Sequence, residues 1–187
     1  MHISEKSSIF AAKITQMPMI EHWWGFATMP KNMTYPSNGE DNPMTLICQF
    51  KLGEGLVYVF ADLDYFFGDI DVEGGNLGEW PHKFYKVLYS PTRNNLHEHA
   101  ISYSDGTSAV PEAREIASYD SRVLSKPMTW TDELAQEYPG YEVLVQLEED
   151  EDIDLRFYDC GTLFFLIKPE DLQARNFNRV KCVLYSY

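Results

Sequence analysis

The chain contains an imperfect internal repeat of paired apolar segments. Residues 44–50 and 55–61 form the first copy, and residues 141–147 and 159–167 form the second. In each copy, an apolar segment with a single glutamine is followed by a connector, a glycine and another apolar segment. Self-similarity of this kind is typical of a duplicated structural unit. The repeat constrains the fold strongly, because both copies must find equivalent surroundings.

The repeat predicts an α+β fold built from two related β-rich halves. We expect the halves at about residues 29–110 and 126–187, within a single domain over residues 1–187. A chain of this length with 44% apolar residues can bury one sizeable core. The predicted strands are joined by a hairpin or by a longer connector, which favours a mostly antiparallel sheet with a few short helices.

Local patterns predict the remaining elements. Helical spacing, or proline and acidic residues in a first turn, predicts helices at residues 7–16, 111–118, 131–138 and 168–172. Apolar runs predict strands at residues 83–89, 97–103 and 180–187, and Asp105-Gly106 is typical of a turn. Residues 23–30 and 35–39 contain too many proline and turn residues to predict regular structure.

Gln49 and Gln146 occupy matching positions of the repeat, on segments that are apolar on both faces. Such strands are usually central and covered, so both amides should be buried, where an unpaired amide costs ~1–3 kcal/mol. Two interpretations remain open. The glutamines could line a ligand cleft between the halves, or they could bond to loop backbone, which is the commoner role of buried polar groups.

The chain is strongly acidic, with a formal net charge of −14. This field repels phosphate backbones and anionic lipid surfaces, so we expect neither nucleic acid nor membrane binding. The acidic residues are concentrated in residues 62–79 and 148–154. These blocks are typical of solvated loops that maintain solubility. The alternative is that they attract a basic protein partner, which makes binding residues of Glu148, Glu149, Asp150 and Asp152.

Cysteine usage and the N-terminal sequence predict a cytoplasmic protein. The first residues lack the layout of a signal peptide, and no apolar run is long enough to cross a bilayer. The chain has three cysteines without paired metal spacing. Cys48 and Cys160 lie within or beside apolar segments, so we expect both to be buried and slow to react.

Two further groups of residues could form sites. His97 and His99 would share one face of a strand and could bind a metal ion, but an exposed strand end is the better explanation of this spacing. The acidic run at residues 150–154 lacks the glycine and the final glutamate of a calcium loop, so we expect no metal and no cofactor. Trp24 and Trp80 could cover the edge of the core or anchor a partner.

Several short motifs are similar in order and spacing to those of the YwqG-like family, a bacterial family of unknown function. In the amino half these are Met29-Pro30, Tyr35-Pro36, Pro43-Met44, Cys48-Gln49, Gly55-Leu56 and Val59-Phe60. In the carboxy half they are Val145-Gln146-Leu147, Asp159-Cys160-Gly161, residues 164–167, Glu170-Asp171-Leu172 and Asn176-Phe177. The resemblance implies an α+β arrangement of two related halves. It also implies partner binding, because such proteins occur in bacterial toxin-immunity neighbourhoods.

These observations lead to two hypotheses of different class. The first is a non-enzymatic protein-recognition module whose acidic surface engages a basic protein, such as a toxin. The alternative is a hydrolase or metal-dependent enzyme with its site in the cleft between the halves, formed by the two glutamines, Asp159 and the histidines. The recognition module agrees better with the charge and with the lack of a catalytic motif. The sequence leaves the oligomeric state open.

Overall fold

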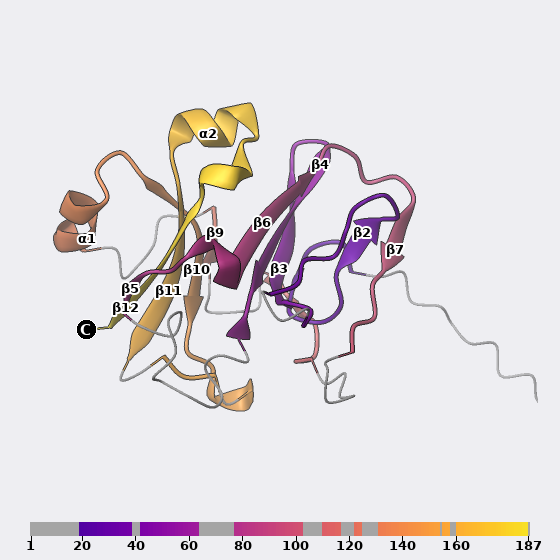
Figure 1. The fold of residues 1–187 in the computed structure, drawn as a ribbon, viewed down its shortest axis with the longest axis horizontal. Helices are drawn as coiled ribbons and strands as arrows, with labels where there is room; N and C mark the ends of the chain where they lie inside the picture. Colours follow the sequence, from indigo (N-terminus) through magenta and orange to yellow (C-terminus); the bar gives the residue numbers. More distant parts are fainter. Residues whose placement is uncertain are drawn as a thin grey trace, which may run out of the picture.

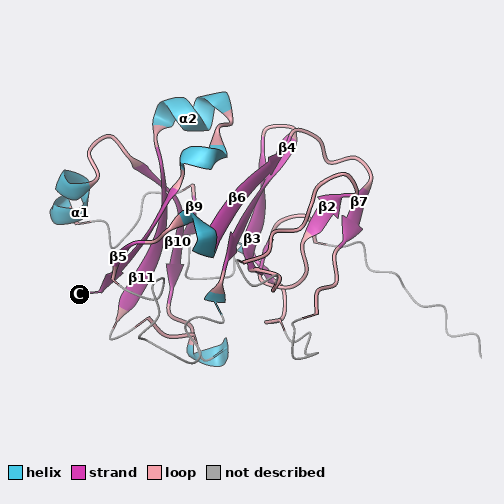
Figure 2. Ribbon diagram, in the orientation of Figure 1, coloured by secondary structure: helices cyan, strands magenta, loops and turns pink. Residues whose placement is uncertain are grey.

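The chain folds into two antiparallel sheets that share one core, as seen in a computed structural model. The structure describes residues 19–38, 42–63, 77–102, 110–116, 122–124, 131–153, 155–157 and 160–186. The sheets face each other, and a small two-stranded sheet lies outside one of them (Figure 1). The helices are short and lie at the periphery (Figure 2). The predicted helix at residues 7–16 and the turn at residues 105–106 lie outside the described residues.

The first sheet is formed mainly by the first copy of the repeat. Its strand order is β6-β4-β3-β1-β8. The predicted hairpin joins β3 to β4 through Gly53 and Glu54, with Leu52 paired to Gly55. The strands are β1 (His22–Trp23), β3 (Thr45–Leu52), β4 (Gly55–Ala61), β6 (Tyr85–Ser90) and β8 (Arg114–Glu115).

The second sheet is formed mainly by the second copy. Its strand order is β5-β12-β11-β10-β9. The neighbours β10, β11 and β12 therefore follow the same spatial order as β3, β4 and β6 in the first sheet. Strand β5 is the exception, because it precedes β6 in the chain yet pairs with β12. The strands are β5 (Gly78–Glu79), β9 (Arg122–Val123), β10 (Glu142–Glu148), β11 (Gly161–Ile167) and β12 (Lys181–Ser186).

A single large hydrophobic core fills the space between the two sheets. Cys48 and Phe50 of β3 and Val145 and Leu147 of β10 point into it, together with Trp80 from the segment after β5. All five are 2% exposed or less. Because each sheet contributes one apolar face, neither sheet could bury that face alone.

The outer face of each sheet has its own cover. The small sheet of β2 (Thr28–Pro30) and β7 (Leu96–Glu98) covers the first sheet, where Tyr58 and Phe60 are fully buried. Helix α1 (Asp132–Glu137) covers the second sheet through Leu134. Helix α2 (Pro169–Ala174) and the 3-10 helices η2 (His82–Phe84), η4 (Glu151–Ile153) and η5 (Phe177–Arg179) complete the elements.

The glycines of the repeat are required for the same reason in both copies. Gly55 begins β4, and a Cβ atom there would lie 2.3 Å from the carbonyl oxygen of Ser90. Gly161 begins β11, and a Cβ atom there would lie 2.1 Å from the carbonyl oxygen of Phe157. Real Cβ atoms do not approach backbone so closely, so any larger residue would displace the strand.

The sequence patterns misassigned the short strands. The helix expected at residues 111–118 is wrong, because Arg114–Glu115 forms β8 and pairs with β1. The segment expected to be irregular contains β1 and β2, separated by Trp24 and Gly25 with positive φ angles of 59° and 71°. Strands of two or three residues form through distant partners, so local composition does not predict them.

Candidate binding sites

The two glutamines of the repeat lie on the outer faces of their sheets. Gln49 pairs with Tyr58, which belongs to the cluster under the small sheet. Gln146 pairs with Phe164, which belongs to the cluster under α1. The core lies between them, so the glutamines do not line a common cleft between the halves. The interpretation that they line such a cleft disagrees with the structure.

Gln49 binds backbone, at the first residue of β2 and at Ile20 before β1, which agrees with the commoner role of buried amides. Its Oε1 accepts a hydrogen bond from the Thr28 N–H at 2.8 Å, and its Nε2 donates to the Ile20 carbonyl at 2.9 Å. Gln146 differs, because its Nε2 donates to the carboxylate of Glu148 rather than to backbone. Among the described residues, its buried Oε1 has no hydrogen-bond partner.

Trp24 and Trp80 are core residues. Their side chains are 0% and 2% exposed, and both belong to the cluster between the sheets. The expectation that they anchor a partner is therefore wrong, because a hot-spot residue must present its ring at the surface of the free protein. Both indole rings are large and apolar, so their burial in the core is favourable.

Hydrogen bonds to other parts of the chain fix the acidic segment at the end of β10. Glu148 accepts a hydrogen bond from the Thr162 hydroxyl at 2.7 Å. Glu149 Oε1 accepts hydrogen bonds from the N–H groups of Phe157 at 2.8 Å and Gly161 at 3.3 Å. These carboxylates close the connection between β10 and β11. Their interpretation as freely solvated charges is wrong.

Asp150 ties the same segment to the first sheet. Its carboxylate lies 2.7 Å from the guanidinium of Arg114 in β8, and its side chain is only 9% exposed. Asp152 lies 3.6 Å from the same guanidinium, but its side chain is 81% exposed. Of the four predicted acidic binding residues, Asp152 is the one that presents most of its charge to solvent. Asp159 lies outside the described residues.

The histidines do not form a metal centre in the described part of the chain. His97 lies in β7 opposite Met29, and His99 follows it, with both side chains at least partly exposed. His82 stacks on Tyr85 at a centroid distance of 4.9 Å, in a different element. Among the described residues, no three His, Cys, Asp or Glu side chains are grouped to hold a metal ion.

The cysteines divide into two buried thiols and one exposed thiol. Burial raises the pKa of Cys48 and of Cys182 well above the ordinary value, which suppresses the reactive thiolate. Cys160 was expected to be buried, and this is wrong. It lies at the turn before β11 with φ 60° and is exposed. The turn that allows Gly161 to lie close to the Phe157 backbone also directs the Cys160 side chain outward.

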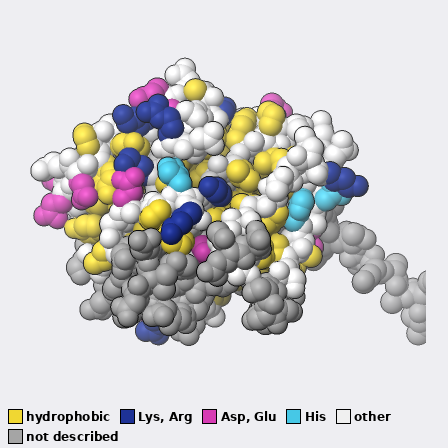
Figure 3. All heavy atoms as spheres, in the orientation of Figure 1, with side chains coloured by type: hydrophobic (Ala, Val, Ile, Leu, Met, Phe, Trp, Pro, Cys, Tyr) yellow, Lys and Arg dark blue, Asp and Glu magenta, His cyan; other side chains and the backbone are white. Residues whose placement is uncertain are grey.

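An acidic and aromatic surface surrounds α1, and no pattern in the sequence indicated it. Figure 3 shows acidic side chains gathered on this side of the molecule among hydrophobic ones. We call this surface the α1 patch. It comprises the exposed carboxylates Glu79, Asp132, Glu133, Glu137 and Glu142 and the half-buried rings of Tyr141 and Tyr185, with the buried ring of Tyr138 packed against Tyr141.

The α1 patch already holds a cation of the chain itself. The Lys181 ammonium lies 2.5 Å from a carboxylate oxygen of Glu79 and 5.8 Å from the ring centroids of Tyr138 and Tyr141. Burial, followed by the nearby Glu137 and Glu79, raises the pKa of Tyr138 to about 12, so its hydroxyl stays neutral. Neutral rings beside carboxylates attract cations through the ring quadrupole and charge together.

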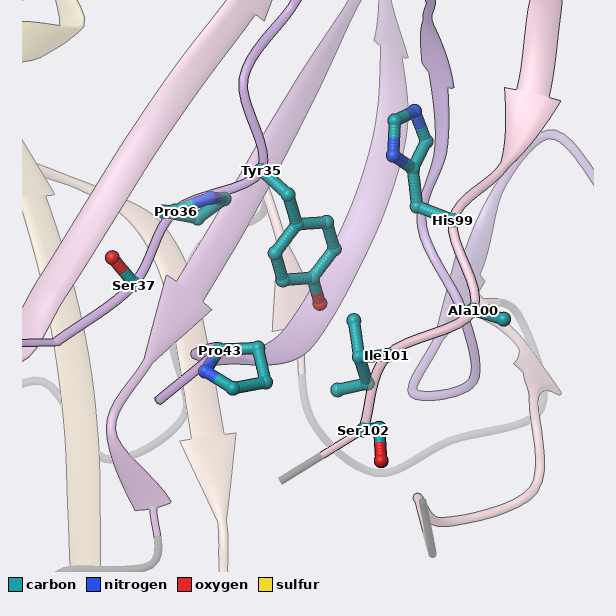
Figure 4. A pocket seen from close by; sticks show the side chains of 8 residues that line it. All are labelled: Tyr35, Pro36, Ser37, Pro43, His99, Ala100, Ile101 and Ser102. Atoms are coloured by element: carbon teal, nitrogen blue, oxygen red, sulfur yellow. The ribbon is translucent and has the colours of Figure 1, made fainter. Parts of the chain in front are cut away.

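A pocket of about 270 Å³ opens on the opposite side of the molecule, beside β7 (Figure 4). One wall comes from the segment before β3, with Tyr35, Pro36, Ser37 and Pro43. The other comes from the continuation of β7, with His99, Ala100, Ile101 and Ser102. These segments are far apart in the sequence. Tyr35-Pro36 and Pro43 belong to the motifs that resemble the YwqG-like family, but no local sequence pattern indicated that they face residues 99–102.

The fold and these surfaces define a strand-rich protein with antiparallel sheets and few helices. A family model described as "Domain of unknown function (DUF1963)" matches residues 62–185. The match covers more than half of the chain, so the chain belongs to this family. Comparison with curated proteins found no match. Among the described helices, none has the length and apolar character needed to cross a membrane.

Proposed function

We propose that the chain is a non-enzymatic protein-recognition module that engages a basic partner through the α1 patch. The observation that carries this proposal is the position of Lys181 between the carboxylate of Glu79 and the rings of Tyr138 and Tyr141. A surface that holds one ammonium in this way offers the same chemistry to lysine and arginine side chains of a partner.

The charge of the whole chain supports the same partner. A net charge of −14 raises the encounter rate with a basic protein and disfavours acidic competitors. The apolar core between the sheets supports recognition over the enzymatic alternative, since the cleft required for catalysis there is filled by side chains such as Phe50 and Leu147. A bacterial toxin fits the partner class that the YwqG-like resemblance implied.

We also propose that the two sheets derive from one duplicated half. The common neighbour order of β3-β4 with β6 and of β10-β11 with β12 supports this origin. Both copies also carry a register shift, at Ile47 in β3 and at Leu144 in β10. Two strands that share both order and irregularity are more simply explained by duplication than by coincidence.

Affinity capture followed by kinetics tests the function. The wild type is used to capture partners from a lysate of the source cells, and each captured protein is purified and its association rate measured across a salt series. The test variant carries Glu133→Gln, Glu137→Gln and Glu142→Gln in the α1 patch. The control carries Glu112→Gln, Glu151→Gln and Glu170→Gln, which are exposed elsewhere and remove the same charge.

We expect the patch variant to associate more slowly, with a flatter salt dependence, while the control changes less. Rim charges act mainly on encounter, so thermal stability should be nearly the same in both variants. Equal slowing in the two variants would mean that net charge alone is responsible. Unchanged association in both would contradict the proposed function.

A further inference from the structure

We propose that the pocket beside β7 binds one aromatic side chain of a partner segment that adds as a strand to the edge of β7 that no described strand covers. This proposal rests on the recognition function proposed above, and it names the form of the partner at a second place on the surface. Three features carry it: the fixed wall that carries Tyr35, the size and lining of the pocket, and the edge of β7 that no described strand covers.

The wall of the pocket that carries Tyr35 is fixed before any ligand arrives. The Tyr35 hydroxyl donates to the Met44 carbonyl at 3.0 Å, and the ring packs edge-on against Phe60 with centroids 5.1 Å apart. An isolated β-bridge joins Ser37 to Pro43. Ligand binding therefore costs little ordering of this wall, which favours affinity.

The pocket suits a single neutral side chain. Its volume of about 270 Å³ lies below the range of roughly 300–1,000 Å³ typical of sites for drug-sized ligands. Its lining includes no Lys, Arg, Asp or Glu. The rings of Tyr35, Pro36 and Pro43 with the Ile101 side chain offer flat apolar contacts, and two serine hydroxyls supply polar groups. An aromatic ring matches this lining better than a charged or a long flexible group.

The neighbouring strand provides the means to hold a peptide. Among the described residues, β7 pairs with β2 alone, and Glu98 and Ala100 are exposed. The His99 N–H donates to the Ala27 carbonyl at 2.8 Å. Backbone groups alternate in direction along an antiparallel strand, so those of Glu98 and Ala100 point to the side that no described strand covers. A partner strand can bond there and place a side chain into the adjacent pocket.

Nuclear magnetic resonance with defined peptides tests the proposal. The probe is an uncharged, terminally blocked heptapeptide of threonine and serine with one central phenylalanine. Its matched controls carry alanine at the centre, or keep phenylalanine but carry N-methyl groups on alternate backbone nitrogens. Benzyl alcohol represents a free ring. All titrations are made in about 0.5 M sodium chloride, where charge attraction is screened, so failure of the α1 patch would not affect the result.

We expect the phenylalanine peptide to shift amide signals of Tyr35, Ser37 and residues 98–102. The alanine and the N-methylated peptides should each bind about tenfold more weakly, because one loses the ring and the other loses the strand bonds. Ser102→Trp, at the pocket, should weaken binding, whereas the control Gln173→Trp, at an exposed and uncharged position of α2, should not.

Each contrary outcome overturns the proposal. Equal binding of the alanine peptide would exclude the aromatic anchor, and equal binding of the N-methylated peptide would exclude strand addition. Benzyl alcohol binding as tightly as the peptide would define a small-molecule site instead. Absence of shifts at Tyr35, Ser37 and residues 98–102 with wild-type protein would exclude the site, whatever the two tryptophan variants do to folding.

Discussion

Trp24 and Leu124 occupy the same place in the two sheets. Both have left-handed backbone, with φ angles of 59° and 48°. The Trp24 N–H donates to the Ile47 carbonyl and the Leu124 N–H to the Leu144 carbonyl, each at 2.9 Å. Ile47 and Leu144 are the residues at the register shifts of β3 and β10. The correspondence thus reaches β1 and β9, where the two stretches of sequence have little in common.

Leu124 provides a direct test of the strain at this position. It is 42% exposed and has a positive φ, which costs a non-glycine residue of order 1–3 kcal/mol. Leu124→Gly should therefore raise the free energy of unfolding by up to about 1 kcal/mol, once the added freedom of the unfolded chain is subtracted. Leu124→Ala keeps the strain and should not stabilise. Urea denaturation of both variants distinguishes strain relief from simple removal of the exposed side chain.

The two glutamines should differ in their contribution to stability. Gln49→Met leaves the buried Thr28 N–H and the Ile20 carbonyl without their side-chain partner, so we expect a loss of ~1–3 kcal/mol. Gln146→Met removes the Nε2 bond to the Glu148 carboxylate, but it also removes a buried Oε1 that has no partner among the described residues, so its loss should be smaller than that of Gln49→Met. Equal losses in chemical denaturation would show that volume, and not hydrogen bonding, determines both values.

The acidic connection between β10 and β11 should contribute to stability. Glu149→Ala removes the acceptor of the Phe157 and Gly161 N–H groups, and bonds to charged groups are worth about 1.5–3 kcal/mol. Glu151→Ala, two residues further along the chain, changes an exposed side chain and should fall within about 0.5 kcal/mol of wild type. Thermal unfolding of the pair decides between a structural and a purely solvating role for this segment.

His22 should make stability depend on pH. Burial lowers the pKa of His22 below its ordinary value of 6.5, while Nδ1 lies 2.7 Å from the Trp24 carbonyl oxygen. Below pH 6.5, His22 becomes protonated in the unfolded chain but stays neutral in the folded chain. The free energy of unfolding therefore falls with decreasing pH until the pKa of His22 in the folded chain is passed. Urea midpoints between about pH 7.5 and 5.5 measure this slope. It should decrease in His22→Gln and persist in the exposed control His97→Gln.

The thiols should differ sharply in reactivity. A thiol reagent added to native protein should label Cys160 quickly and Cys48 and Cys182 slowly, because the latter are fully buried with raised pKa values. Mass spectrometry should find one fast label in native protein and three after unfolding. Cys160→Ser should remove the fast label. Fast native labelling of Cys48 would contradict its position in the core.

The parts of the fold that sequence predicts are those held by local signals. The β3–β4 hairpin follows from apolar runs around Gly53, and α1 is preceded by its N-cap Thr131, whose hydroxyl accepts a hydrogen bond from the Leu134 N–H at 3.3 Å. Strand β8 could not be predicted, because two residues gain strand structure only by pairing with β1. Local propensity is too weak to decide such cases.

The candidate sites were harder to predict, because they depend on contacts between distant segments. The charge run at residues 148–152 is visible in the sequence, but its bonds to Arg114 and Thr162 are not. The pocket combines residues 35–43 with residues 99–102. Trp24 and Trp80 were candidates because of their chemistry, yet burying such large rings stabilises the core more than exposing them.

Strand β5 has a consequence for the synthesis of the chain. Gly78–Glu79 is made early, but it pairs with Val183 and Leu184, and the following Trp80 N–H donates to the Cys182 carbonyl at 2.8 Å. A ribosome adds roughly 5–20 residues per second, so this segment waits for several seconds before its partner strand emerges. During that interval the indole of Trp80 lacks the second-sheet side of the core that buries it in the finished protein.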